Sequence, residues 1–194
     1  MSDTQRPVLH RLREAVLALA AKNPVQELSV SEVCREADVT RDTFYRYASS
    51  PTNLLAAYFE EELETLLEVG PFVGADGEAV IQRCTVPARK WLEHVMQYEQ
   101  VYRHAAQPRL PYALVAALGR CIHTLLIELL NQRPDIAPRV LGEEATEDDI
   151  DLFATFIVSG TIALFERELF SFPEIDIERT IDVVRGAATG WMFT

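Results

Sequence analysis

The segment from Ser29 to Tyr47 constrains this chain most, because it predicts two short helices joined by a tight turn. Ser29-Val-Ser-Glu32 has the spacing of a capping box, in which a serine oxygen and a glutamate carboxylate satisfy the first backbone N–H groups of a helix. Asp38-Val39 follows as the turn, and Thr40 is placed to cap a second helix over Arg41 to Tyr47. This pattern indicates a helix-turn-helix hairpin.

Apolar residues of this segment repeat with the period of a helix, which predicts a small core shared by the two helices. Its expected members are Val33, Ala37, Val39 and Phe44. The remaining positions of the second helix then face outward. They carry hydrogen-bonding, cationic and aromatic groups of the kinds that reach phosphates and base edges: Arg41, Thr43, Tyr45 and Arg46.

The rest of the chain also has helical rather than alternating periodicity, so the expected fold class is all-α. Helices are predicted at about 7–22, 51–67, 79–106, 111–131, 148–171 and 176–192. Pro87 must either kink its helix or begin a new one after Thr85. The glycine-rich stretch 70–77 and the proline-rich, acidic stretch 133–149 are predicted loops.

Charge is divided unevenly along the chain, and this division decides what the net charge of −12 implies. Residues 1–50 hold seven Lys or Arg and seven Asp or Glu, so the whole negative balance lies after residue 50. An acidic body attached to a neutral head can still bind nucleic acid if the basic groups of the head share one face.

The composition favours a protein of the reducing cytoplasm. Cys34, Cys84 and Cys121 are odd in number and scattered, which indicates neither a disulfide framework nor a metal module. The N-terminal residues lack the apolar stretch of a signal peptide, and the longest strongly apolar run, Leu152 to Phe165, is too short to cross a bilayer. We therefore expect no membrane partner, no metal and no cofactor.

The string from Leu28 to Tyr47 resembles the DNA-binding head of the tetracycline-repressor (TetR) family. That family shows Ala-Gly-Val-Ser-x-x-Thr-Leu-Tyr-x-Tyr-Phe, and residues 37–48 here read Ala-Asp-Val-Thr-Arg-Asp-Thr-Phe-Tyr-Arg-Tyr-Ala. The motif resemblance covers roughly residues 8–60. It implies a three-helix DNA-binding domain over residues 1–50, followed by a helical ligand-binding and dimerisation domain over residues 51–194.

The resemblance also implies roles for individual residues. Phosphate contacts are implied for Thr40, Thr43 and Tyr47, and major-groove positions for Arg41, Tyr45 and Arg46; Ser29 and Ser31 are further phosphate candidates. Three departures imply weaker or narrower DNA binding. Asp38 replaces the usual turn glycine, Pro51 stands where a lysine is frequent, and Asp42 adds a negative charge near the DNA.

Members of this family dimerise through their last two helices, and the corresponding segments here are strongly apolar. A C2 homodimer would present two recognition helices to a pseudo-palindromic operator. The expected interface residues are Phe153, Ile157, Gly160, Leu164, Ile177, Ile181, Val184, Ala188 and Trp191. The alternative is a bundle that buries these helices within one chain.

A pocket for a small apolar or aromatic effector is implied among the middle helices. Aromatic and histidine side chains recur there, although the same residues also suit an ordinary bundle core. The candidates are Phe59, Leu63, Trp91, His94, Tyr98, Tyr102, His123 and Phe156.

The sequence shows no motif of a known catalytic class, so we expect no enzymatic activity. The leading hypothesis is a DNA-binding transcriptional regulator, a repressor that its ligand releases from DNA. The alternative hypothesis is a helical dimer that binds a small molecule or a protein and whose head has weak or lost operator affinity.

Overall fold

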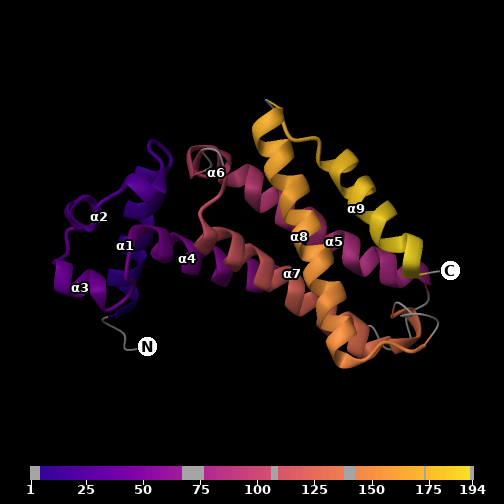
Figure 1. Cartoon of the computed structure of the whole chain (residues 1–194). Helices are drawn as coiled ribbons and strands as arrows, with labels where there is room; N and C mark the ends of the chain where they lie inside the picture. The colour runs from indigo at the N-terminus through magenta and orange to yellow at the C-terminus, as the bar shows by residue number, and fades with distance from the viewer. Residues whose placement is uncertain (1–4, 67–76, 106–108, 138–142, 173, 193–194) are drawn as a thin grey trace. The chain divides into compact units, whose positions relative to one another are not determined.

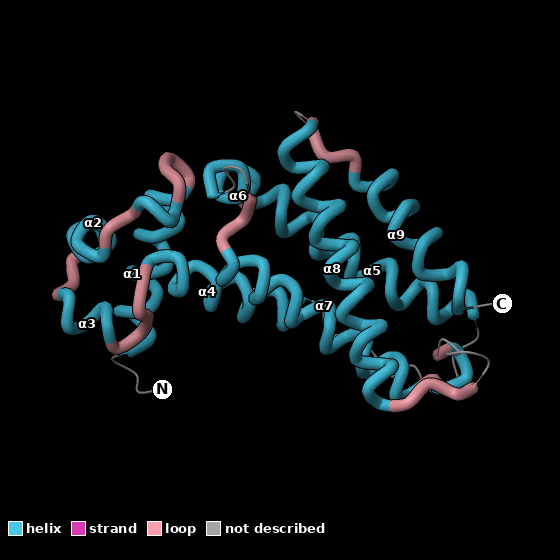
Figure 2. The backbone as a smooth tube through the Cα atoms, viewed as in Figure 1, coloured by secondary structure: helices cyan, strands magenta, loops and turns pink. Residues whose placement is uncertain are grey.

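The computed structural model describes residues 5–66, 77–105, 109–137, 143–172 and 174–192, and the elements formed by these residues are helices without a strand (Figures 1 and 2). The expected all-α class is confirmed. The chain divides into two compact units, unit 1 (Met1–Glu62 and Gln97–Ala117) and unit 2 (Leu63–Met96 and Leu118–Thr194). This division does not coincide with the expected boundary after residue 50, because later segments pack with the N-terminal helices.

Unit 1 is built around α1 (Gln5–Ala20), which contacts α2 (Val30–Glu36) and α6 (Glu99–Ala105). The turn η1 (Val25–Glu27), the short helix α3 (Arg41–Tyr45) and the first part of α4 (Pro51–Leu66) complete it (Figure 1). Four helices contribute fully buried side chains to its core: Leu12 and Val16 of α1, Val33 of α2, Phe44 of α3, and Leu55 and Phe59 of α4.

Arg13 holds α4 against α1 in unit 1. Its guanidinium donates to the Glu61 carboxylate and lies 5.0 Å above the centre of the Tyr58 ring. The hydroxyl of Tyr58 belongs to a polar cluster with Glu62 and Tyr98. It donates to Glu62 Oε1 at 2.8 Å, and the Tyr98 hydroxyl donates to the same oxygen at 3.1 Å. These contacts tie α4 to the chain segment that begins α6.

Unit 2 contains α5 (Gly77–Gln97), most of α7 (Tyr112–Gln132), α8 (Glu147–Ser171) and α9 (Ile177–Met192) (Figure 1). Helix α8 begins with a capping box between Thr146 and Asp149, in which Asp149 N–H donates to Thr146 Oγ1 at 3.2 Å. Helices α8 and α9 contact each other, and Arg89 of α5 pairs with Glu178 of α9. The four helices thus form one bundle.

Of the two alternatives left open at Pro87, the structure has the single helix: α5 continues through Pro87, and no new helix begins after Thr85. The predicted helix over residues 79–106 is interrupted at Tyr98, although no glycine or proline marks the break in the sequence. The acidic stretch after Arg133 includes a short 3-10 turn at Pro134–Ile136, and the expected loop at 70–77 lies outside the described residues except for Gly77.

Helix α7 is long and apolar enough to cross a membrane by length and composition alone. Its burial explains that composition in another way. Leu114, Leu118, Leu129 and Leu130 are fully buried against other parts of the fold. This is the position of a core helix, which is apolar because it is covered on several sides.

Candidate nucleic-acid interface and ligand cavity

Side-chain caps start both helices of the α2–α3 hairpin (Val30–Tyr45). Ser29 Oγ accepts from Glu32 N–H at 3.2 Å, while Glu32 Oε2 accepts from Ser29 N–H at 2.8 Å. Hydrogen bonds from Ser29 lower the pKa of the Glu32 carboxyl, so the carboxylate that closes the cap stays charged. At α3, Thr40 Oγ1 accepts from Thr43 N–H at 3.2 Å. The predicted capping box and threonine cap are confirmed.

Asp38 makes the turn between the two helices with a backbone φ of 51°. This left-handed conformation is the reason that glycine is usual in such a turn, and aspartate adopts it more readily than most other residues. Arg11 Nη1 donates to the Asp38 carbonyl oxygen at 3.2 Å, which ties the turn to α1.

The side chains of α3 divide between an inward and an outward face. Phe44 is fully buried, with its ring edge-to-face against Tyr45 at a centroid distance of 5.7 Å. Tyr45 itself is 58% exposed, and Arg41 and Arg46 are also exposed. The structure therefore directs outward the three side chains for which the motif implied major-groove positions.

Hydrogen bonds within the hairpin orient these outward groups. Arg46 Nη2 donates to Thr43 Oγ1 at 3.3 Å, and Arg41 donates to the Ser31 hydroxyl. The Thr40 and Thr43 hydroxyls lie 2.9 Å apart, while Tyr47 is only partly exposed. Asp42 is exposed on the same short helix. The surface thus combines two cations, hydroxyl groups and one carboxylate.

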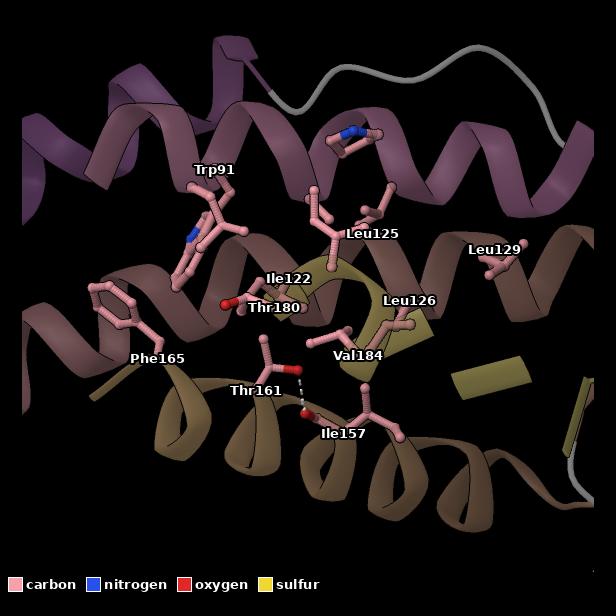
Figure 3. Close-up of a pocket in the computed structure, with 14 residues that line it drawn as sticks. Trp91, Ile122, Leu125, Leu126, Leu129, Ile157, Thr161, Phe165, Thr180 and Val184 are labelled. Carbon is pink, nitrogen blue, oxygen red and sulfur yellow. Dashed lines mark hydrogen bonds between the residues drawn. The ribbon is translucent and has the colours of Figure 1, made fainter. Parts of the chain in front are cut away.

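Unit 2 contains a cavity of about 120 Å³ between α5, α7, α8 and α9 (Figure 3). Its walls are aliphatic and aromatic, and its polar side chains are Trp91, Thr161 and Thr180. Helix α7 contributes one stripe with helical spacing: Ile122, Leu125, Leu126 and Leu129. These α7 residues carry no signal in the sequence that marks them as a pocket wall, because the same stripe is expected of any buried helix.

Of the eight residues expected to line a pocket, Trp91 lies in the wall of this cavity (Figure 3). His94, on the same helix, is buried, and burial lowers its pKa to about 4. His123 pairs with Asp151 at 3.1 Å, and Leu63 is fully buried. Phe156 is 73% exposed, so the structure corrects its expected position inside a pocket.

The remaining three expected pocket residues form an aromatic stack within unit 1. The ring of Phe59 lies 4.9 Å from that of Tyr98 and 5.2 Å from that of Tyr102, measured between centroids. Tyr102 is fully buried. In unit 1 these rings pack on one another. This is the ordinary core packing that was the alternative to a pocket for these residues.

Of the expected interface residues whose side chains the structure describes, Gly160 is exposed and the others are buried or half-buried within the single chain. Phe153 packs on a core cluster, Ile157 and Val184 line the cavity, and Ile181 is 4% exposed. Leu164 and Ile177 are half-buried, and the side chains of Ala188 and Trp191 lie outside the described set. The exposed apolar side chains next to Gly160 are instead Leu152 and Phe156, which are 68% and 73% exposed.

Among the described residues, no group of three or more histidine, cysteine or acidic side chains is arranged to hold a metal ion. Cys34 and Cys121 are buried, and burial raises the pKa of the Cys34 thiol. A buried, protonated thiol is a poor nucleophile and a poor metal ligand.

No protein-family model matches the chain. It is 28% identical over 122 residues to the HTH-type transcriptional repressor KstR of Mycolicibacterium smegmatis, an alignment that covers 63% of this chain and 59% of that protein. The chain therefore aligns with less than two thirds of this relative's length.

Two solved structures share the fold over nearly the whole chain. A TetR transcriptional regulator from Rhodococcus sp. RHA1 matches with a TM-score of 0.64 and 16% identity, covering 99% of both chains. The dihydroxyacetone kinase operon activator DhaS matches with a TM-score of 0.61 and 12% identity, covering 95% of this chain and 96% of its own. These similarities define the fold class: an all-helical, TetR-like protein with a helix-turn-helix. The chain is thus similar in fold to a TetR regulator and, over 122 residues, similar in sequence to the repressor KstR.

Proposed function

We propose that the chain is a cytoplasmic, homodimeric transcriptional repressor that binds a pseudo-palindromic DNA operator through α3 and is released by a small ligand. The observation that carries the DNA-binding part is the outward cluster of Arg41, Tyr45 and Arg46 on a capped, rigid hairpin. Arginine reads guanine bidentately in the major groove, and positions fixed by caps and a buried Phe44 meet the geometric demand of such contacts.

Dimerisation is supported by the exposed face of α8. Leu152 and Phe156 expose large apolar side chains one helical turn apart, and a Cβ added at Gly160 would meet nothing within 4 Å in the monomer. The absence of a side chain at Gly160 is therefore not required by packing within the chain. A second α8 helix can approach closely there.

Ligand release is supported by the cavity in unit 2. A ligand that prefers one conformation and an operator that prefers another are linked by a coupling free energy, so that each weakens the binding of the other. The cavity and the α2–α3 hairpin belong to different units, which provides the two distinct sites that such linkage requires.

The test is fluorescence anisotropy of the purified protein on the DNA upstream of its own gene, with scrambled DNA alongside and a salt series. We expect saturable, sequence-selective binding by a dimer, with an affinity that falls linearly on a logarithmic scale as salt rises. Equal affinity for both DNAs at every salt concentration would contradict the proposed operator in that region.

A second candidate function is a small-molecule-binding dimer with a weak DNA head. Asp42 favours it, since its exposed carboxylate stands beside Arg41 on α3 and would approach DNA phosphates. Asp42→Asn separates the two functions. If the head is weakened by this charge alone, the substitution raises DNA affinity, and the gain is largest at low salt, where the repulsion between the carboxylate and the phosphates is least screened.

A further inference from the structure

Helix α3 presents two charged residues on the side opposite to its buried face. Phe44 is fully buried. Successive residues of an α-helix lie about 100° apart around the axis, so Asp42 and Arg46, two positions before and after Phe44, each lie about 160° away from it. Both residues are exposed. Position 42 therefore belongs, with Arg46, to the surface that faces away from the core of the hairpin.

The neighbouring arginines do not neutralise Asp42. Arg41 donates to the Ser31 hydroxyl of α2. Arg46 Nη2 donates to Thr43 Oγ1 at 3.3 Å. Within the part of the chain that the structure describes, no ion pair or hydrogen bond engages the carboxylate of Asp42. Its acceptor oxygens are therefore available to a molecule that approaches this surface.

The chemistry of a carboxylate restricts the base that Asp42 can contact. A recognition helix places residues near its N-terminus against base edges in the major groove, and Asp42 is the second residue of α3. A carboxylate only accepts hydrogen bonds. Thymine O4 and guanine O6 and N7 are acceptors that repel it, and adenine N6 stands beside the acceptor N7. Cytosine presents its N4 amino donor and no acceptor, so it suits a carboxylate best.

We propose that Asp42 reads a cytosine in each half of the operator by accepting a hydrogen bond from the cytosine N4 amino group. This assignment rests on the proposed DNA-binding function and names one base pair that the operator contains. The negative charge is repelled by the phosphates of any DNA, whereas the hydrogen bond forms only where the cytosine stands. Asp42 thus acts on specificity, by penalising every other base at that position.

Selection from a library of DNA duplexes with a randomised core, followed by sequencing, tests the proposal on the whole chain. We expect the wild type to enrich duplexes with a C·G pair at one position of each half-site. An asparagine amide pairs bidentately with adenine N6 and N7, so Asp42→Asn should enrich an A·T pair at that position and leave the other positions unchanged. A purely structural role of Asp42 would not change the preferred base at a single position.

Fluorescence anisotropy on two duplexes measures the size of the effect. One duplex carries the enriched sequence, and the other carries T·A in place of the C·G pair in one half-site. The wild type should bind the second duplex about tenfold more weakly, which is the usual cost of a mismatched pair. Asp42→Asn should bring the two affinities close to equality. Their ratio cancels both the general repulsion of DNA and any loss of folded protein.

Asp148→Asn is the matched control. Asp148 has the same position in α8 as Asp42 has in α3, two residues after a threonine cap, and it is also exposed. The control therefore makes the same change of net charge and removes the same first-turn carboxylate, but in unit 2. We expect it to enrich the same duplexes as the wild type.

Two results would overturn the assignment and leave the proposed function intact. One is a wild-type selection in which the enriched half-site contains no cytosine that Asp42→Asn changes. The other is an affinity ratio of the two duplexes that is the same in the wild type and in Asp42→Asn, with only the overall affinity altered. The proposed function fails in a different way. A wild-type chain that enriches no sequence contradicts operator binding itself, and the reading of cytosine with it.

Discussion

The indole of Trp91 meets the ring of Phe165 edge-to-face, with centroids 4.8 Å apart and planes at 76°. This contact joins α5 to α8 at the wall of the cavity, and both residues are almost completely buried. The same pair therefore contributes to the stability of the bundle and shapes the space that a ligand would occupy.

Phe165→Ala should lower the free energy of unfolding by about 3–5 kcal/mol, because it removes a buried ring and enlarges the cavity beside Trp91. Urea unfolding followed by far-UV circular dichroism measures the change. Phe156→Ala on the same helix is the matched control, with a loss below about 0.5 kcal/mol expected from its exposed position. Comparable losses in both variants would contradict the assigned packing.

Arg46→Ala should weaken operator binding by about 1–3 kcal/mol if its guanidinium contacts a base. Anisotropy on the operator and on scrambled DNA distinguishes a base contact from a phosphate contact. The loss of a base contact lowers the affinity for the operator more than the affinity for scrambled DNA. Lys22→Ala removes an exposed cation elsewhere in the same unit and should leave operator selectivity unchanged. An unaltered affinity with the fold intact would remove Arg46 from the reading surface.

Phe156→Glu should yield monomers, because it places a charge in the exposed apolar face of α8. Light scattering after size-exclusion chromatography measures the mass. Thr124→Glu adds the same charge at an exposed position of α7 and should remain dimeric. A dimeric Phe156→Glu variant would place the interface elsewhere. A charged residue at position 184 would not test the interface in the same way, because Val184 lines the cavity.

Stability should fall as the pH is lowered from about 6.5 to about 4, because buried His94 has its pKa lowered to about 4. Above pH 6.5 the imidazole is neutral in both states. Between the two values the unfolded chain binds a proton that the folded chain excludes, which costs about 3 kcal/mol in total. Urea midpoints at pH 7.5 and 4.5 should therefore differ less in His94→Gln than in the wild type; an equal difference would contradict this origin.

Asp38→Gly should stabilise unit 1 by about 0.5–1 kcal/mol, because glycine adopts a φ of 51° without the steric cost that aspartate carries. The Arg11 hydrogen bond to the backbone carbonyl does not depend on the side chain and is retained. Asp38→Ala should be destabilising instead. Thermal unfolding of both variants checks the signs, and a stabilising alanine would contradict the strained turn.

Local signals in the sequence were sufficient for the hairpin. The capping box of Ser29 and Glu32, the cap at Thr40 and the left-handed turn at Asp38 each depend on residues at most a few positions apart. Interactions of that range form from the chain itself, so the pattern predicts both the helices and the outward face that holds Arg41 and Arg46. The break at Tyr98 had no such signal.

The cavity and the outward face of α8 could be settled only by the tertiary structure. Helix α8 is apolar nearly all round, so periodicity does not tell Phe153, which packs inward, from Leu152 and Phe156, which are exposed. The rotation of a helix about its axis is fixed by the neighbours it packs against, and those neighbours are distant in sequence. The sequence therefore indicated Trp91 as a candidate pocket residue. It did not indicate the α7, α8 and α9 side chains around Trp91, because only the packing of the bundle brings them together.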